Sequence, residues 1–240
     1  MSFATIAKRF INYLGISCPK GSSRPIYVGY EMEKDSIKSG TTTIALRWKE
    51  GMVTAADKRA TAGHMVVMRD VEKVVPISDT MLLTISGSVS DAQLLIKYIR
   101  AELKLNSLRL NRMNTVKEAA NLLGQIVYSG VRQMIPSITH FLLSGKDEDG
   151  FHIYEIFVDG SVNAIKDFVS SGSGSIYALG LLEGEYTQNM SIDEGIALIK
   201  RALNSALLRD TASGNGADIF TVTEQGIEKK ETIIVNTGLQ

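Results

Sequence analysis

The alternation of apolar and polar residues after position 40 predicts a first block of short strands. Apolar side chains recur at every second position in runs of about five residues, the usual strand length. The predicted strands span residues 43–48, 52–56, 64–68, 74–77 and 81–86. The polar residues between the first two runs are typical of a hairpin turn.

The pattern then changes to a period of three to four residues, which predicts two pairs of amphipathic helices. Three helices are expected to begin at a capping box, in which Ser or Thr is followed three positions later by Gln or Glu. The boxes are 90–93, 115–118 and 191–194, and the remaining helix is expected at 176–182. Strand patterns return at 139–144, 151–158, 162–165, 218–223 and 232–235.

The order of these blocks is strands, two helices, strands, two helices, strands, which favours an α+β fold class. Strands that follow one another directly form hairpins and mostly antiparallel sheets. Two pairs of amphipathic helices need two apolar sheet faces to cover. We therefore predict one domain at residues 41–240: a four-layer αββα sandwich of two mostly antiparallel sheets covered by helices.

The first forty residues differ from the rest of the chain. Phe3, Ile6, Phe10 and Leu14 recur at near-helical spacing, which predicts a short amphipathic helix. Residues 26–28 form a brief strand-like run after a loop rich in Pro, Gly and Ser. The segment reads equally as a poorly ordered extension or as a removable propeptide.

Composition excludes several classes of function. The 240 residues are 44% hydrophobic and 22% charged with a formal net charge of zero, so a basic footprint for nucleic acid is missing. Apolar runs stay shorter than the roughly 18–20 residues needed to span a bilayer. The single cysteine, Cys18, excludes an intrachain disulfide, and the sequence has no paired Cys and His spacings for zinc. We expect no metal, cofactor, nucleic-acid or membrane binding.

A junction between a charged segment and a strand lies at Gly40 and Thr41. One interpretation is a glycine turn that leads into a strand. The other is a cleavage site, because a cut after Gly40 would give Thr41 a free α-amine beside its hydroxyl. A nucleophile and its own base would then lie on one residue.

Other candidates for chemistry lie at the ends of predicted strands. Asp57 follows an apolar run, where charged residues usually form a solvated turn. Lys73 falls within an apolar pattern, so it is either exposed on an edge strand or buried beside a carboxylate such as Asp57. Gly87 precedes a predicted helix, where its N–H either contacts a ligand or belongs to a plain turn.

Two polar motifs complete the set of candidates, and a third kind of site is disfavoured. Ser173 lies between two glycines, but a dinucleotide fingerprint would need a third glycine. Asp210 ends a predicted helix, where the helix dipole disfavours an anion, so it has either a functional role or a local turn bond. A serine–histidine triad fits poorly, because His64, His140 and His152 lie in predicted strands away from a candidate nucleophile.

Together these motifs resemble those of proteasome β subunits, most closely the archaeal type. The resemblance covers residues 41–240 and depends on the order and spacing of motifs that are individually weak. They are residues 40–43, 55–59, 73, 86–87 with 91–93, 171–175 and 209–214. The family has the four-layer sandwich, and its members are N-terminal nucleophile hydrolases. The tyrosine- and glutamine-rich start of proteasome α subunits is absent from this sequence.

The resemblance implies a threonine peptidase that removes its own propeptide, residues 1–40, by cleavage between Gly40 and Thr41. Thr41 would be the nucleophile, and Lys73 a nearby cation that favours the deprotonated forms of the Thr41 amine and hydroxyl. Asp57 would hold Lys73 in place, and the Gly87 N–H would form the oxyanion hole. The remaining polar network would consist of Ser173, Asp210 and Ser213.

The resemblance also implies a pocket for the substrate residue before the scissile bond, with a preference for apolar side chains. Its lining residues would be Ala60, Val71, Val75, Ile85 and Val89. Implied partners are α subunits and other β subunits in stacked heptameric rings, an unfolding ATPase acting through the α ring, and unfolded protein substrates. The implied location is the cytoplasm.

Two features depart from the family pattern: the long N-terminal extension, and Ser88 and Ser90 where small or apolar residues are common. The alternatives are a catalytically silent structural β subunit, an N-terminal nucleophile amidase that acts on a small amide, and a bacterial two-ring peptidase.

Overall fold

The computed structural model describes residues 40–131 and 139–235, all of which fall within one compact unit of the chain. The expected helix near residues 3–14 and the expected strand at 26–28 lie outside the described residues. Most described residues belong to two five-stranded antiparallel sheets and four helices.

The first sheet has the strand order β10-β1-β2-β11-β12, and every neighbouring pair is antiparallel. Its strands are β10 (Phe168–Ser171), β1 (Thr43–Trp48), β2 (Gly51–Asp57), β11 (Gly216–Thr223) and β12 (Gly226–Ile234). The three interior strands, β1, β2 and β11, are almost wholly buried.

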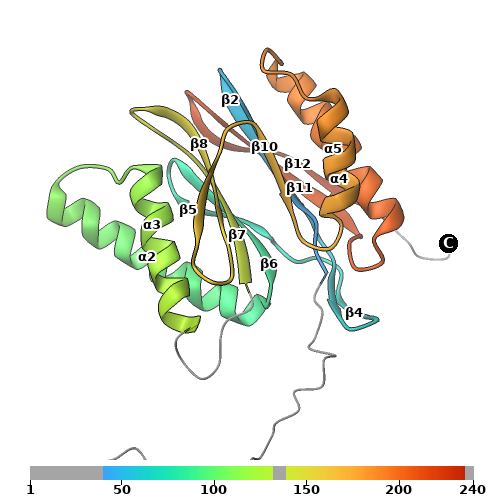
Figure 1. The fold of residues 1–240 in the computed structure, drawn as a ribbon, viewed down its shortest axis with the longest axis horizontal. Helices are drawn as coiled ribbons and strands as arrows, with labels where there is room; N and C mark the ends of the chain where they lie inside the picture. The colour runs from blue at the N-terminus through green and yellow to red at the C-terminus, as the bar shows by residue number, and fades with distance from the viewer. Residues whose placement is uncertain (1–39, 132–138, 236–240) are drawn as a thin grey trace, which may run out of the picture. The chain divides into compact units, whose positions relative to one another are not determined.

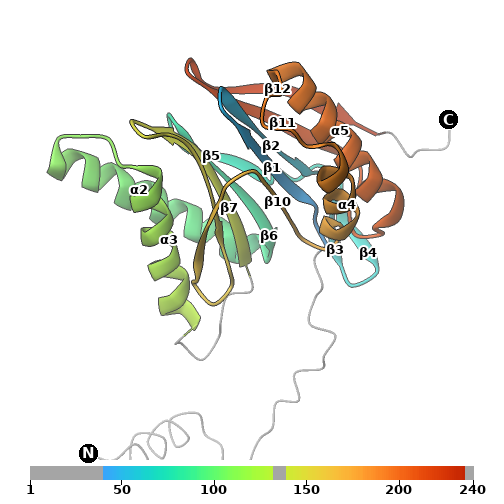
Figure 2. The ribbon, with the colours of Figure 1, turned by 45° about the horizontal axis from the view of Figure 1, so that its top comes forward.

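The second sheet has the order β5-β6-β7-β8-β9, again with antiparallel neighbours throughout. Its strands are β5 (Val74–Ser78), β6 (Met81–Gly87), β7 (Thr139–Asp147), β8 (Gly150–Ile156) and β9 (Val162–Ile165). A separate hairpin of β3 (Ala60–Ala62) and β4 (Met65–Met68) projects beside the first sheet (Figure 2).

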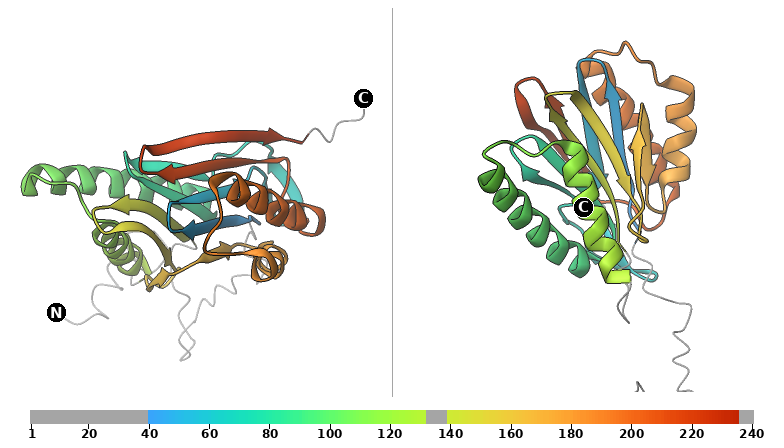
Figure 3. Two further views of the ribbon diagram at one scale, coloured as in Figure 1. Left: turned by 90° about the horizontal axis from the view of Figure 1, so that it is seen from above. Right: turned by 60° about the vertical axis from the view of Figure 1, so that its left-hand side comes forward.

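Helices cover the outer face of each sheet, so the unit has four layers (Figure 1). The second sheet is covered by α2 (Val89–Leu110) and α3 (Val116–Val131), and the first by α4 (Ser175–Glu185) and α5 (Ile192–Arg209). The views in Figure 3 show the same sequence of helix, sheet, sheet and helix. The predicted αββα sandwich is therefore confirmed.

Each interface between layers has its own apolar core. Leu83, Phe141 and Leu143 pack against α2 and α3 on one side, and Ile44 and Leu46 pack against α4 and α5 on the other. A third cluster joins the two sheets and includes Ala45, Val74, Leu82 and Leu142. Successive residues of a strand therefore face opposite cores, as the period of two requires.

Several predicted boundaries differ from the structure. β3 and β10 were not predicted, because a three-residue strand has little pattern and residues 170–171 were read as a Ser- and Gly-rich loop. β12 begins at Gly226 rather than 232. The first capping residue is Ser88 rather than Ser90, because its side chain accepts from Asp91 N. The boxes at Thr115 and Ser191 are confirmed.

Candidate active site

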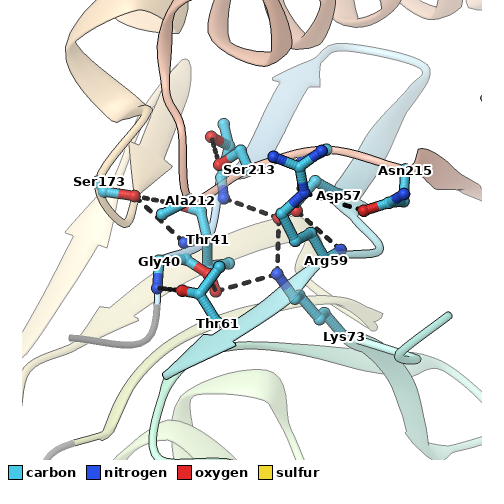
Figure 4. A network of polar contacts seen from close by, with 12 residues as sticks. Gly40, Thr41, Asp57, Arg59, Thr61, Lys73, Ser173, Ala212, Ser213 and Asn215 are labelled. Carbon is cyan, nitrogen blue, oxygen red and sulfur yellow. Dashed lines mark hydrogen bonds and ion pairs between the residues drawn. The ribbon is translucent and has the colours of Figure 1, made fainter. Parts of the chain in front are cut away.

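Strand register brings the candidate residues to one end of the sandwich. β1 begins two residues after Thr41, and Thr43 pairs with Ala56 of β2 and with Ser171 of β10. Asp57 follows Ala56 at the end of β2, and Ser173 lies two residues after Ser171, just beyond β10. Both residues therefore lie beside Thr41. Lys73 and Gly87 reach the same end from the second sheet. Figure 4 shows Thr41, Asp57, Lys73 and Ser173 close together.

The Thr41 hydroxyl lies between a buried amine and the peptide bond that precedes it. Its Oγ1 accepts a hydrogen bond from Lys73 Nζ at 3.1 Å and donates to the carbonyl oxygen of Gly40 at 2.7 Å. The Thr41 backbone N–H donates to Ser173 Oγ at 3.2 Å. Thr41 is only 3% exposed, and these hydrogen bonds hold its hydroxyl and its nitrogen in place.

Asp57 and Lys73 form a buried ion pair, which settles the open interpretation of Lys73 in favour of burial. Lys73 Nζ lies 2.7 Å from Asp57 Oδ1, and the two residues are 4% and 1% exposed. Burial lowers the pKa of Lys73 from its ordinary value, while the Asp57 charge opposes that change. The neutral amine, which can accept a proton, is thus more accessible than on an exposed lysine.

Backbone groups fix the Asp57 carboxylate. Oδ1 also accepts from Thr42 N at 2.9 Å, and Oδ2 accepts from Arg59 N and Gly214 N, both at 3.0 Å. These donors come from the residue just before β1, the segment that follows β2 and the loop before β11. The carboxylate therefore holds Lys73 and also joins the segments that surround Thr41.

Asp210 is the centre of a second set of hydrogen bonds. Its Oδ2 accepts from the hydroxyls of Ser173 and Ser213, each at 2.6 Å, and Oδ1 accepts from Ala212 N at 3.2 Å. The Ser213 hydroxyl also meets Thr42 Oγ1 at 2.7 Å. These local hydrogen bonds explain why α5 tolerates an aspartate at its C-terminus. They also link the Asp210 carboxylate to the Thr41 nitrogen through Ser173.

Two glycines allow the chain to pass close to Thr41. A Cβ added to Gly40 would lie 1.7 Å from the Ala212 Cβ, so a larger residue at 40 cannot fit without movement. Gly172 has a φ of +91°, and an added Cβ would lie 2.0 Å from the Thr41 carbonyl oxygen. Both positions combine a close approach with a requirement for glycine.

A pocket of about 590 Å³ opens beside Thr41 and Lys73 and includes Gly87 in its lining. Four of the five residues expected to bind an apolar substrate side chain also line it: Val71, Val75, Ile85 and Val89. The fifth, Ala60, is not among the lining residues, although Met68, its partner in the β3–β4 hairpin, is.

The structure thus brings together the polar residues that the sequence singled out, and it adds others. Thr61 Oγ1 accepts from Gly40 N at 3.1 Å, and Thr42, Arg59 and Gly214 contact the central carboxylate. Thr61 was missed because its contact with Gly40 depends on how distant segments meet, which no local pattern encodes. Ala212 lay in the 209–214 motif already noted, but its close approach to Gly40 had no separate signal. Arg59 lay in a motif already noted, but its backbone role had no separate signal.

Among residues 40–131 and 139–235, no group of three or more His, Cys, Asp or Glu side chains is placed to hold a metal ion. Within the same described parts of the chain, no helix is both long enough and apolar enough to cross a membrane.

Comparison with known proteins gives a consistent result. The family model described as "Proteasome subunit" matches residues 37–222. The chain is 44% identical over 191 residues to "Proteasome subunit beta" of Haloquadratum walsbyi, a match that covers 80% of this chain and 76% of that protein. The corresponding protein of Haloferax volcanii is 42% identical over 198 residues (82% and 79% covered). That of Methanopyrus kandleri is 36% identical over 193 residues (80% and 91% covered).

The sandwich of two helix-covered sheets defines the N-terminal nucleophile hydrolase fold. The chain belongs to the proteasome subunit family and is a β subunit. Proteins of this family assemble into proteasomes, which are proteases, so the expected family is confirmed.

Proposed function

We propose that this β subunit is a threonine-type endopeptidase whose Thr41 becomes the N-terminal nucleophile after cleavage of the Gly40–Thr41 bond. One observation carries the proposal: Thr41 Oγ1 lies within hydrogen-bonding distance of both Lys73 Nζ and the carbonyl oxygen of Gly40. Residues 1–40 are then a propeptide, and residues 41–240 are the catalytic domain.

In the first stage the chain cleaves itself. In its neutral form, which the lowered pKa makes more accessible, Lys73 takes the Thr41 hydroxyl proton and becomes the ammonium that pairs with Asp57, and Oγ1 attacks the carbonyl carbon of Gly40. The bond from that carbon to the Thr41 nitrogen breaks, and the nitrogen takes up a proton to become an amine. The ester left on Oγ1 is hydrolysed by water, which gives the Gly40 carboxylate and restores the hydroxyl.

In the second stage the mature enzyme hydrolyses substrate peptides. The Thr41 α-amine, with an ordinary pKa of about 7.7–8.0, takes the proton from Oγ1 near neutral pH. Oγ1 attacks the substrate carbonyl, and the Gly87 N–H donates to the oxyanion, an interaction typically worth about 2.7–4 kcal/mol of barrier. In the uncleaved chain Ser173 accepts a hydrogen bond from the Thr41 N–H. In the mature enzyme the same serine, held by Asp210 together with Ser213, would hold the free amine. Water then hydrolyses the acyl-enzyme.

The apolar side chains beside Thr41 support a preference for apolar residues before the scissile bond. The family resemblance adds the setting: heptameric β rings stacked between α rings in the cytoplasm, fed with unfolded proteins by an ATPase acting through the α ring. No cofactor takes part in the proposed chemistry, since the proton acceptors and the oxyanion donor are groups of the protein itself.

The test compares wild type with Thr41→Ala and Thr41→Ser in an assembly that contains this chain as its only β subunit. We expect wild type to lose residues 1–40 by intact mass and to hydrolyse peptides with an apolar residue before the cut. Thr41→Ala should remain uncleaved and inactive, whereas Thr41→Ser, which keeps a hydroxyl, should retain part of both activities.

An uncleaved wild-type chain with full peptidase activity would contradict the two-stage mechanism. Unchanged activity in Thr41→Ala would instead identify a catalytically silent structural subunit. A small particle without α partners would point to an amidase of the same fold. The size of the purified assembly distinguishes such an amidase from a proteasome core, which is far larger.

A further inference from the structure

A second polar cluster joins the two sheets close to the active site. Its centre is His140 of β7, whose Nδ1 lies 2.7 Å from Ser171 Oγ of β10. Ser171 Oγ also lies 3.1 Å from Ser86 Oγ of β6, and the Ser86 hydroxyl donates to the His140 carbonyl oxygen at 3.4 Å. The hydrogen bonds therefore connect the first sheet, through Ser171, to the second sheet, through Ser86 and His140.

The ring of His140 is fixed on its other sides. It stacks on Phe157 with ring centroids 4.7 Å apart, and Nε2 lies 3.1 Å from Glu155 Oε1 without hydrogen-bond alignment. Glu155 of β8 is the ionisable group placed against the ring. With one nitrogen toward Ser171 and the other toward Glu155, the imidazole has a defined orientation.

Ser171, His140 and Glu155 have the order of a serine–histidine–acid triad, but they are unsuited to nucleophilic catalysis. Ser171 is 3% exposed, and its hydroxyl faces the interior between the sheets. Among the described residues that line the pocket beside Thr41, none belongs to this cluster. Substrate therefore has no access to Ser171, and the cluster requires another explanation.

Both serines immediately precede residues of the active site. Ser86 pairs with His140 across β6 and β7, and the next residue of β6 is Gly87, the proposed oxyanion donor. Ser171 is followed by Gly172, which packs against the Thr41 carbonyl, and then by Ser173, which accepts from the Thr41 N–H. Gly87 in the second sheet and Gly172 beside the first sheet thus each lie one residue beyond the hydrogen bonds that join the two sheets.

On the basis of the proposed peptidase function, we infer that His140 is a positioning residue that fixes the oxyanion donor relative to the nucleophile. The apolar residues between the sheets hold the layers together but are not directional. The Asp57–Lys73 ion pair also joins the two sheets, and the bond from His140 to Ser171 adds a further directional contact at the residues that immediately precede Gly87 and Gly172. A displacement of about 1 Å between reacting groups can lower a rate by about 100-fold, so a small loss of alignment is measurable.

The test uses the assembled particle with His140→Leu, His140→Asn and His152→Leu variants. Leucine removes both ring nitrogens, whereas asparagine keeps a polar group near the Nδ1 position that faces Ser171. His152 is a matched control, because this histidine of β8 also contacts a carboxylate, Asp147, at 3.1 Å and stacks on an aromatic ring, but at the opposite end of the sheet. Precursor cleavage, kcat, KM and the unfolding midpoint are measured for each.

We expect His140→Leu to lower the rate of precursor cleavage and kcat by about 10- to 100-fold. KM should stay within about twofold of wild type, because the pocket is unchanged. The unfolding midpoint should match that of His152→Leu, and His140→Asn should recover most of both rates.

Equal rates in His140→Leu and His152→Leu, or a His140→Asn variant no faster than His140→Leu, would overturn the inference. Thr41→Ala, measured in parallel, separates this failure from that of the proposed function. If Thr41→Ala retains peptidase activity, the proposed function itself fails and the role of His140 falls with it. If Thr41 is required but His140 is not, only the positioning role is wrong.

Discussion

Gly40→Ala tests whether the fit of one small residue controls self-cleavage. The added Cβ would lie 1.7 Å from the Ala212 Cβ and 2.9 Å from Ser173 Oγ, the acceptor of the Thr41 N–H. Apolar carbons normally stay about 3.5–4.0 Å apart, so the two segments must separate by about 2 Å. Since a misplacement of 1 Å can cost about 100-fold in rate, we expect cleavage to slow by at least about 100-fold, or about 2.7 kcal/mol of barrier.

The assay follows the disappearance of the full-length chain by intact mass after synthesis, which gives a first-order rate constant. The double variant Gly40→Ala, Ala212→Gly should recover part of the rate, because the closest contact is removed while the Ala212 Cα at 2.9 Å remains. Gly130→Ala is a matched control, since an added Cβ there would meet no atom within 4 Å. Cleavage of Gly40→Ala at the wild-type rate, or no recovery in the double variant, would refute the steric argument.

The remaining predictions concern the buried ion pair and the Gly172 turn. Asp57→Asn should lower the free energy of unfolding, measured in urea, by about 3–5 kcal/mol, because the buried Lys73 charge loses its partner. The double variant Asp57→Asn, Lys73→Met should recover part of that loss. If the losses of the two single variants simply add in the double variant, the coupling is absent and the prediction is wrong. Burial lowers the pKa of Lys73, so the unfolded chain binds more protons between that value and about 10.4. Stability of wild type relative to Lys73→Met should therefore rise with pH across that range, and a flat difference would argue against it. Gly172→Ala should slow precursor cleavage by about 100-fold in the same mass assay, since its Cβ would meet the Thr41 carbonyl oxygen, and normal cleavage would exclude that contact.

Periodicity predicted most of the fold because each strand and helix has one face toward a core. β1 and β2 alternate between the core under α5 and the core between the sheets, which is the pattern that the sequence displays. β10 was missed because residues 170–171 have the composition of a loop. Their strand conformation comes from pairing with β1, a contact across more than a hundred residues.

The candidate site was predictable in its residue types but not in its contacts. Asp57 was available as a partner if Lys73 was buried, and the structure has that pair. The hydrogen bond from Gly40 N to Thr61 and the close approach of Ala212 could not be predicted, because they depend on how three segments far apart in the sequence meet. The bridge through His140 depends on how one sheet lies on the other, which no periodicity specifies.

The groups around Thr41 come from both sheets, since Asp57 and Ser173 lie at the end of one and Lys73 at the end of the other. A chain in which only one sheet has formed therefore lacks either the base or the threonine it would activate. If the proposed self-cleavage takes place, removal of residues 1–40 would occur only after both sheets have formed, and an incompletely folded subunit would have no peptidase activity. Under the proposed mechanism, the arrangement that creates the active site would therefore also delay activity until the subunit is folded.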